Sequence, residues 1–456
     1  MTTPRYEDIE GVRGELQALV AAGDFDRVSD LLKELHPSDV ADLVEALETE
    51  SERVSLFRVL PLELASETLA EMDEEEDPGE ILAALDPKKG AELLHELEVD
   101  DAVDLVGELE PEERAKILAA LPLEEAGEIR GLLRYDEESA GGLMDTLLVR
   151  VQGELSAGQA IAEVRRQGRE VEDFYTVFVV DEGHHLLGTV RLDDLVLADP
   201  LLPVVELVEP VMASVEPDED QEEVSRLMSR YNLPSIPVVD GFGVLLGRIT
   251  FDDVLDVMES EQTEDILRLV GASDEEEIRG TWSETVQTRI PWLGLNLLTA
   301  SLAASVIWVF RDTVDAIILL AVLAPIIAAL GGNAGTQALA VTVRRISLSG
   351  DGEIGAGPYK AVGKELLVGL VNGVILGGVI GIVSLLMPGG NPKLGLVVLL
   401  AMWGNQVVAG FAGSFVPTIL NRFGFDPAVA SSVFVHTFTD LIGFFLLLGL
   451  ATAILL

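Results

Sequence analysis

The sequence has no cysteine and only five histidines among its 456 residues. Without cysteine, the chain has no disulfide framework, thiolate zinc site, iron–sulfur cluster or cysteine nucleophile. The histidines are scattered without the spacing of a zinc site. Neither a nucleophile elbow nor a phosphate-binding glycine loop occurs in residues 1–288. These absences argue against an enzyme.

Basic residues are also scarce, since 30 Lys and Arg stand against 79 Asp and Glu, for a net charge of −49. The imbalance belongs to one half of the chain. Residues 289–456 hold 8 basic and 7 acidic residues, which leaves 22 basic and 72 acidic residues in 1–288. This charge repels nucleic acid and attracts cations, so we expect no nucleic-acid partner. Adaptation to high salt is an alternative, partial cause of the acidity.

Long apolar runs begin at Arg289, and each is long enough to cross about 30 Å of hydrocarbon at 1.5 Å per residue. We expect five spans, at residues 289–310, 314–342, 361–387, 394–420 and 427–455. An odd number of spans places the two chain ends on opposite sides of a lipid bilayer. The chain is thus predicted to be a multi-pass protein of the cell membrane.

The orientation follows from the basic residues that flank the spans. Those expected on one side are Arg289, Arg344, Arg345, Lys360, Lys364 and Arg422, and the other side has only Arg311 and Lys393. Basic residues favour the cytosolic side. The first eight residues also lack the apolar core of a signal peptide. We therefore expect a cytoplasmic N-terminus and an extracytoplasmic C-terminus.

Residues 5 to about 135 have leucine and alanine at helical spacings, and proline recurs at the expected helix starts, as at Pro37, Pro87 and Pro111. Proline suits the first helical position because its missing N–H would be unpaired there. This pattern predicts an acidic, all-α superhelix of short repeats. By itself, such a domain would also suit a scaffold for protein interactions.

The next part of the chain repeats itself. Residues 179–181 (VVD), 186–188 (LLG) and 193–194 (DD) recur at 238–240, 245–247 and 252–253, at a constant offset of 59. Each copy reads as strand, turn, strand and helix. The two copies resemble tandem cystathionine-β-synthase (CBS) domains, which often bind adenine nucleotides such as ATP. The second copy has the nucleotide-associated pattern at Thr250 and Asp253, whereas Arg191 interrupts it in the first.

Asp440 lies deep in the last apolar run, where a charged side chain is costly unless it meets water, a partner or an ion. His436 and Thr437 lie within one turn of it on the same helical face. We expect a cation or proton site here, and a buried Asp bonded to a neighbouring helix is the alternative. Asp426 precedes Pro427, where an N-cap role explains it and a ligand role is secondary.

The second run supplies uncharged oxygens at Asn333, Thr336 and Gln337, among glycines that either loosen the backbone or allow close helix packing. Carboxylate, amide and carbonyl oxygens form a site for a hard cation, and Mg²⁺ is the natural candidate, with Co²⁺, Mn²⁺ and Ni²⁺ as alternatives. One acid at this depth per chain implies a symmetric homodimer that pairs two copies of Asp440.

With these parts in this order, the chain resembles the MgtE family of Mg²⁺ channels over essentially its whole length. The motif residues are Pro325 with 331–337 (GGNAGTQ), and 426–428 (DPA) with Thr439 and Asp440. The predicted domains are the helical superhelix (1–138), CBS unit 1 (139–200), CBS unit 2 (201–258), a connecting helix (259–285) and a five-helix transmembrane domain (286–456). The resemblance implies a multi-domain membrane protein whose pore is lined by the second and fifth spans.

The resemblance also implies cytosolic Mg²⁺ sites that hold the connecting helix against the pore when internal Mg²⁺ is high. By position, their ligands would be Glu67, Asp100, Asp104, Asp220, Glu222, Asp253, Asp256, Glu261, Glu264 and Asp265. Pore-lining residues would be Asn333, Thr336, Gln337, His436 and Thr439. Two alternatives stay open: a carrier that couples Mg²⁺ to Na⁺ or H⁺, and a membrane-anchored nucleotide sensor, against which Asp440 argues.

Overall fold

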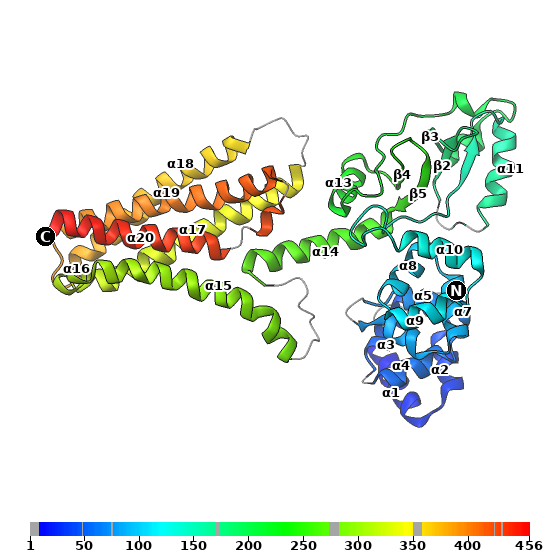
Figure 1. Cartoon of the computed structure of the whole chain (residues 1–456), viewed down its shortest axis with the longest axis horizontal. Helices are drawn as coiled ribbons and strands as arrows, with labels where there is room; N and C mark the ends of the chain where they lie inside the picture. Colours follow the sequence, from blue (N-terminus) through cyan, green and yellow to red (C-terminus); the bar gives the residue numbers. More distant parts are fainter. Residues whose placement is uncertain are drawn as a thin grey trace. The chain divides into compact units, whose positions relative to one another are not determined.

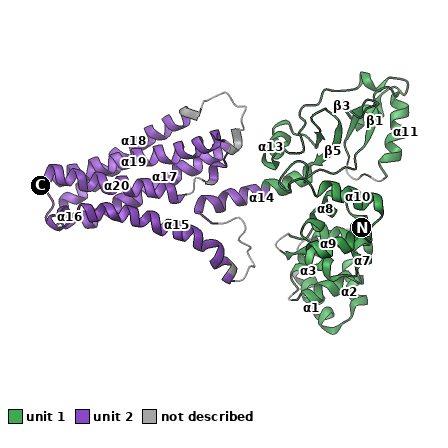
Figure 2. Ribbon diagram, viewed as in Figure 1, with its two compact units in different colours: residues 1–258 green, residues 259–456 purple. Residues whose placement is uncertain are grey.

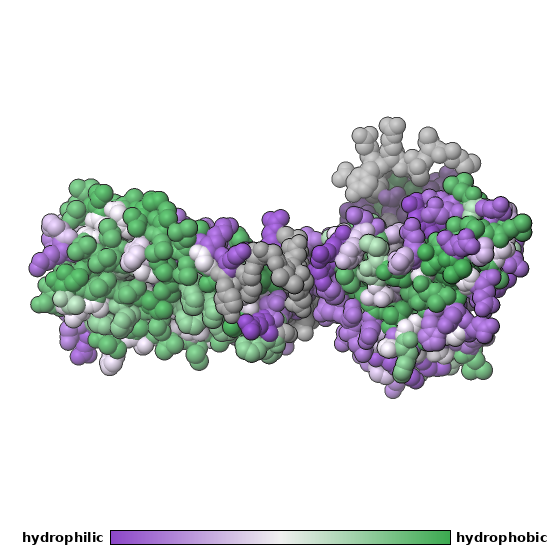
Figure 3. Space-filling view, turned by 90° about the horizontal axis from the view of Figure 1, so that it is seen from above, coloured by the Kyte–Doolittle hydropathy of each residue, from purple (hydrophilic) through white to green (hydrophobic). Residues whose placement is uncertain are grey.

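The computed structural model of the chain describes residues 9–47, 49–73, 76–169, 171, 174–272, 282–349, 358–423, 425–429 and 432–456. These residues form two compact units, Met1–Met258 and Glu259–Leu456 (Figure 2). The units differ in surface character. On the face shown in Figure 3, hydrophobic residues cover much of the second unit, whereas hydrophilic and hydrophobic residues are interspersed on the first.

The first unit begins with short helices joined by tight turns (Figure 1). Proline occupies the first turn of α3, α7 and α9, as the sequence predicts. The odd-numbered helices pack in one row and the even-numbered helices in another, each helix against the next but one in sequence, and contacts such as that between α1 and α2 join the rows. The helices are α1 (Ile9–Ala22), α2 (Phe25–Leu32), α3 (Pro37–Glu45), α4 (Glu50–Phe57), α5 (Leu62–Ala70), α6 (Pro78–Ala84), α7 (Pro87–Glu96), α8 (Val99–Gly107), α9 (Pro111–Leu118) and α10 (Leu123–Leu132).

The repeated segment forms two matching α/β halves. In the first half, β1 (Arg150–Gln152) runs parallel to β2 (Thr176–Val180), and β2 pairs antiparallel with β3 (Leu186–Arg191). In the second half, β4 (Ser235–Val239) pairs antiparallel with β5 (Leu245–Thr250). Each hairpin has its register shift at the equivalent place, between Val179 and Val180 and between Val238 and Val239, as expected for a duplicated unit.

Helices accompany the strands of the two α/β halves, and backbone hydrogen bonds join one half to the other. The helices are α11 (Ala157–Gln167), α12 (Leu192–Leu197), α13 (Gln221–Tyr231) and the first turns of α14 (Phe251–Val270), with a 3₁₀ turn η3 (Val204–Glu206) between the halves. Backbone bonds from Leu186 N to Gly243 O (2.9 Å) and from Leu245 N to His184 O (3.0 Å) join the two halves. The second half shares one hydrophobic core with the helical rows through Ile249 and Val254.

The second unit contains the end of α14 and helices long and apolar enough to cross a membrane. Five candidate spans occur in the described residues: Thr285–Val309, Leu319–Ile346, Lys360–Leu386, Pro392–Arg422 and Ser432–Leu455. They belong to α15 (Trp282–Val309), α17 (Leu319–Ser349), α18 (Pro358–Leu386), α19 (Pro392–Arg422) and α20 (Ser432–Leu455). Helix α19 packs against α17, α18 and α20, so it forms the centre of the bundle.

Two predicted boundaries differ from the observed ones, and a third is not tested. The second run was expected from 314, but the backbone leaves the helical region at Ile317 (φ −134°, ψ 82°), which separates the short helix α16 (Arg311–Ala316) from α17. The last run was expected from 427, but a 3₁₀ turn, η4 (Pro427–Val429), precedes α20. The predicted connecting helix includes residues 273–281, which lie outside the described residues.

Glycines bring α18 and α19 into backbone contact. Gly369, Gly373, Gly377 and Gly381 recur every fourth residue on one face of α18. A Cβ at Gly369 would stand 2.5 Å from the carbonyl oxygen of Gln406 on α19. Small residues at this spacing let membrane helices approach closely. The motif glycines of α17 instead leave room for side chains of α19 and α20, and that helix continues unbroken from Leu319 to Ser349.

Candidate ion-binding sites

Asp440 lies on α20, about two turns after Ser432 at 3.6 residues per turn, and is half-buried. Among the residues that the structure describes, no side chain forms a hydrogen bond or an ion pair with its carboxylate. His436, one turn earlier, is held through Nδ1 by the carbonyl oxygen of Ser432 at 2.7 Å. A carboxylate within an apolar span that has no hydrogen bond or ion pair to protein groups is available to an ion or to a second copy of the chain.

The motif glycines of α17 face α20 and α19. A Cβ at Gly332 would stand 2.5 Å from His436, and one at Gly335 would stand 2.3 Å from Val435. The close-packing alternative therefore describes these glycines. Asn333 and Gln337, one turn apart, are exposed on the single chain, and Thr336 is half-buried with an unpaired hydroxyl oxygen.

Two other polar groups of the bundle are enclosed. Thr439 is fully buried, and its hydroxyl donates to carbonyl oxygens of its own helix, at Val435 (3.1 Å) and His436 (3.0 Å). Asn405 Nδ2 donates to the carbonyl oxygen of Ile327 on α17 at 3.0 Å. Asn405 thus joins α19 to α17, and Thr439 is enclosed within the protomer.

Asp426 has two partners. Its Oδ1 accepts the backbone N–H of Ala428 at 2.7 Å, which makes it the cap of η4. Its Oδ2 accepts a hydrogen bond from Arg268 of α14 at 2.6 Å, and Arg268 also pairs with Glu264 one turn earlier. Leu269, next to Arg268, packs on a cluster formed by α17, η4 and α20. The end of α14 is therefore attached to the membrane helices by an ion pair and an apolar contact.

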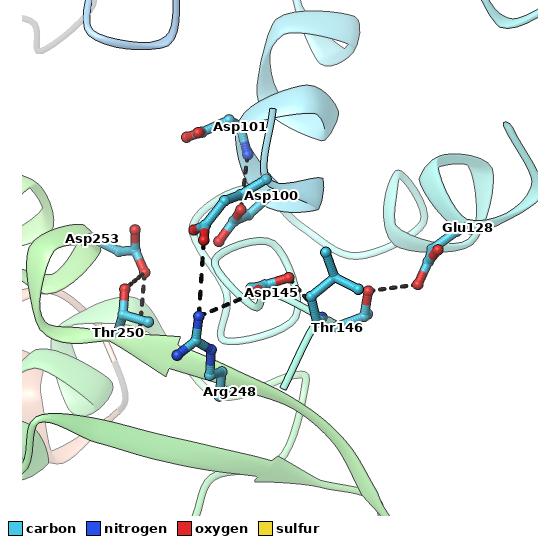
Figure 4. A network of polar contacts seen from close by, with 10 residues as sticks. Asp100, Asp101, Glu128, Asp145, Thr146, Arg248, Thr250 and Asp253 are labelled. Carbon is cyan, nitrogen blue, oxygen red and sulfur yellow. Dashed lines mark hydrogen bonds and ion pairs between the residues drawn. The ribbon is translucent and has the colours of Figure 1, made fainter. Parts of the chain in front are cut away.

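A second group of acids lies in the first unit, where α8 approaches β5 and α14 (Figure 4). We call it the acidic cluster, and it comprises Glu98, Asp100, Asp101, Asp145 and Asp253. Asp145 is fully buried and Asp100 is 6% exposed. The guanidinium of Arg248 lies 3.4 Å from Asp145 Oδ2 and 3.9 Å from Glu98 Oε1. One buried cation thus faces several carboxylates.

The carboxyls of the cluster resist ionisation. Burial, with the Asp145 charge, raises the pKa of Glu98 to about 8. Burial and the Asp253 charge raise the pKa of Asp101 to about 7 and that of Asp100 well above its usual range. Burial raises the pKa of Asp145 to about 6, against the opposing effects of the Leu147 N–H and Arg248. A divalent cation placed here would displace protons and relieve the repulsion.

Thr250 and Asp253 bond to each other. The hydroxyl of Thr250 donates to Asp253 Oδ2 at 2.5 Å, and its backbone N–H donates to the same oxygen at 3.0 Å. In the first half, Arg191 pairs with Asp193 at 2.6 Å instead. Asp253 therefore bonds to Thr250 at the start of α14 and also belongs to the acidic cluster. Its predicted role in nucleotide binding is additional to these.

The other predicted cytosolic ligands are spread out. Asp220 caps α13 through the N–H of Glu222 at 2.8 Å. Glu67, Asp220, Glu222 and Asp256 are exposed, whereas Asp104, Glu261, Glu264 and Asp265 are half-buried. In the described part of the chain, no three acidic or histidine side chains are arranged as a ready metal site. The structure thus brings together Asp100 and Asp253, and attaches Glu264 and Asp426 to Arg268.

Sequence reasoning missed three groups. Glu98, Asp101 and Asp145 join the acidic cluster through the tertiary fold, and no local pattern distinguishes them from dozens of other acids. Arg248 lies on β5 and is buried, which could not be expected from sequence because arginine is usually exposed. Arg268 had a usable signal, because it follows Glu264 at the i, i+4 spacing of helical ion pairs.

Comparison with known families gives three matches along the chain. Residues 17–138 match the MgtE intracellular N domain, residues 204–260 match the CBS domain, and residues 324–450 match the MgtE divalent cation transporter domain. The matches follow the predicted order of helical domain, CBS pair and membrane helices. They confirm the predicted fold class.

Individual relatives point to the same family as the domain matches. The chain is 34% identical over 452 residues to the magnesium transporter MgtE of Thermus thermophilus, which covers 96% of this chain and 98% of the relative. It is 35% identical over 310 residues to the magnesium transporter MgtE of Enterococcus faecalis, over 68% of each chain.

Solved structures cover the first unit. A crystal structure of the cytosolic domain of the Mg²⁺ channel MgtE in complex with ATP is 35% identical, with a TM-score of 0.51, over 54% of this chain and 99% of that one. A crystal structure of the soluble part of a magnesium transporter is 30% identical, with a TM-score of 0.50, over 56% of this chain and 99% of that one.

Proposed function

The chain belongs to the MgtE family of magnesium transporters, and from this premise we propose that it is a homodimeric, Mg²⁺-selective channel gated by intracellular Mg²⁺. Its relatives are transporters and not enzymes, and its apolar helices make it a multi-pass membrane protein. The channel mechanism, the dimer, the orientation and the gating are our proposal.

The observation that carries the proposal is Asp440. It is a carboxylate inside an apolar span with no bonding partner in the described part of the chain. A hydrated dication loses less hydration energy when a fixed negative charge and amide oxygens face its water shell. Two copies of Asp440 across a two-fold axis would supply two such charges. Asn333 and Gln337, exposed on α17, supply amide oxygens for the same path.

The proposed orientation follows from the ends of the helices. Arg344 and Arg345 lie near the end of α17, Lys360 and Lys364 near the start of α18, and Arg422 at the end of α19. These basic residues belong to one end of the bundle, and the positive-inside bias assigns that end to the cytosol. The N-terminus is then cytoplasmic and the C-terminus extracytoplasmic.

Gating would use the acidic cluster and α14. The cluster holds five carboxyls and one guanidinium. The raised pKa values of its carboxyls indicate that a single guanidinium does not neutralise the negative charge of the ionised cluster. Mg²⁺ that binds there favours whichever arrangement brings the carboxylates together. Because α14 begins beside the cluster and ends on the membrane helices at Asp426, it is the element that would carry this preference to the pore.

The test is Mg²⁺ flux into vesicles that contain the full chain, driven by Mg²⁺ alone and with Na⁺ and H⁺ gradients varied separately. We expect flux that does not depend on those gradients, and loss of that flux in Asp440→Asn. A flux that appears only with a Na⁺ or H⁺ gradient would make the chain a coupled carrier. Inhibition of Mg²⁺ flux by Co²⁺, Mn²⁺ and Ni²⁺ gives the order in which the chain selects these ions.

ATP is the proposed nucleotide ligand of the CBS pair. The support is a relative, since the cytosolic domain of the Mg²⁺ channel MgtE has been crystallised with ATP. In this chain, Thr250 and Asp253 place a hydroxyl and a carboxylate at the start of α14, where ribose hydroxyls would be met. Because Asp253 also belongs to the acidic cluster, nucleotide and Mg²⁺ binding would be linked.

A further inference from the structure

Three membrane helices, α17, α18 and α19, line a half-open cavity of about 230 Å³. Its polar lining comes from Gln337 on α17, from Lys364, Glu365 and Asn372 on α18, and from Gln406 on α19. Alanine and glycine make up much of the remaining wall, which is why space is left between closely packed helices. Asp440 does not line this cavity.

Gln406 presents an oxygen without a partner. It is 1% exposed, and its amide nitrogen donates to the carbonyl oxygen of Leu330 on α17 at 3.0 Å. Its Oε1 is buried and has no hydrogen bond within the described residues. A buried amide oxygen that lacks a partner has lost its hydration without a compensating hydrogen bond. Gln406 thus lines the cavity and has a buried amide oxygen that is free to accept a hydrogen bond or a cation.

Glu365 adds a negative charge. In the described part of the chain its carboxylate has no hydrogen bond and no ion pair, and the neighbouring Lys364 does not reach it. Lys364 is exposed, so its ammonium can extend toward the headgroup layer. Glu365, Asn372, Gln337 and Gln406 together offer one carboxylate and three amide oxygens.

We propose that this cavity is a second cation site within the membrane, separate from Asp440, and that it takes a divalent cation together with its water shell. Oxygen-only lining suits a hard cation, and Mg²⁺ keeps several waters in most protein sites. Six waters at about 30 Å³ each need about 180 Å³, which fits the cavity. A lipid phosphate fits less well, because Glu365 repels it.

The site stands beside the proposed pore. Gln337 lines the cavity and lies one turn from Asn333 on the same helix. A cation held here would raise the local supply of ions next to α17 at low Mg²⁺. This role in transport rests on the proposed function, whereas binding in the cavity can be measured without it.

The binding test uses Mn²⁺ as a paramagnetic probe. The chain has no cysteine, so Val371→Cys on α18, 52% exposed, takes a single nitroxide label in the full-length protein. All samples also carry Asp440→Asn, which removes the pore carboxylate. We expect Glu365→Gln to raise the Mn²⁺ concentration for half-maximal broadening of the label at least fivefold.

Matched variants sharpen the result. Asp312→Asn removes an acid that is 93% exposed on α16, and we expect no change. Lys364→Gln removes a like charge, and we expect tighter binding. If Glu365→Gln is poorly folded, Asn372→Leu takes its place with the same expected weakening. Identical Mn²⁺ titrations for the cavity variants and for Asp312→Asn would overturn the inference.

Flux separates this inference from the proposed function. We expect Glu365→Gln to raise the Mg²⁺ concentration for half-maximal flux. If Asp440→Asn abolishes flux but Glu365→Gln alters neither flux nor Mn²⁺ broadening, the cavity site is wrong and the channel stands. If the wild-type chain carries no Mg²⁺, the channel is wrong, and the Mn²⁺ titration still decides the cavity.

Discussion

Replacing Arg268 with glutamine tests how α14 acts on the membrane helices. Arg268 bridges Glu264 on its own helix and Asp426 at the start of η4, with a distance of 2.6 Å to Asp426 Oδ2. Glutamine keeps a polar side chain but removes the charge. If this ion pair helps to hold α14 in the arrangement that closes the pore, its loss weakens inhibition by internal Mg²⁺.

The magnitude follows from the geometry. Two unit charges 2.6 Å apart attract by roughly 1.6 kcal/mol in a water-like medium. Both side chains are 32% exposed, and exposed pairs yield at most about 1 kcal/mol once desolvation and side-chain entropy are included. A change of about 1 kcal/mol is about fivefold in an equilibrium constant. We therefore expect the half-inhibiting Mg²⁺ concentration to rise by up to about fivefold.

Patch recordings over a series of cytosolic Mg²⁺ concentrations measure this shift, with Arg230→Gln, a surface arginine beside Tyr231, as the control. The double variant Arg268→Gln with Asp426→Asn should shift no further than either single change. A lower half-inhibiting concentration would contradict the reasoning, because it would mean that Arg268 competes with Mg²⁺ for Asp426. An unchanged concentration would show that the ion pair has no part in gating.

Three further predictions concern other parts of the chain. The unfolding free energy of residues 1–272, measured by urea titration, should fall as pH rises from about 4.5 to about 8, because the folded carboxyls of the acidic cluster hold protons that the unfolded ones release. At pH 8, Mg²⁺ should restore this stability, whereas NaCl of equal ionic strength should not. Gly369→Ala should lower the thermal midpoint of the full-length protein in detergent, whereas Gly378→Ala, with open space at its Cβ, should leave it unchanged; equal midpoints would refute the close-packing argument. Calorimetric titration should show Asp253→Ala weakening ATP binding at least tenfold, and equal affinities for wild type and variant would remove Asp253 from the nucleotide site.

The local parts of the fold could be predicted from the sequence. Proline starts α3, α7 and α9 because its fixed φ and missing N–H suit a first turn. The apolar runs became helices because backbone groups within hydrocarbon must bond internally. The offset of 59 residues predicted the paired α/β halves, and the structure repeats even the register shift of each hairpin.

The sites were less predictable because they depend on contacts between distant segments. Asp145 is separated from Arg248 by 103 residues, and Arg268 is separated from Asp426 by 158. An acid such as Glu365 resembles many exposed acids until the neighbouring helices define a cavity around it. Depth in an apolar run singled out Asp440 because this signal needs no tertiary information.

The pore carboxylate is the central claim, and Mg²⁺ flux through Asp440 variants in vesicles tests it most directly. Asp440→Asn keeps the volume and removes the charge, so we predict at least a tenfold loss of flux, about 1.4 kcal/mol or more, from a variant that still inserts and elutes as a dimer. Asp440→Glu should retain part of the flux, and Asp312→Asn all of it. Near-normal flux through a well-folded Asp440→Asn dimer would contradict the account.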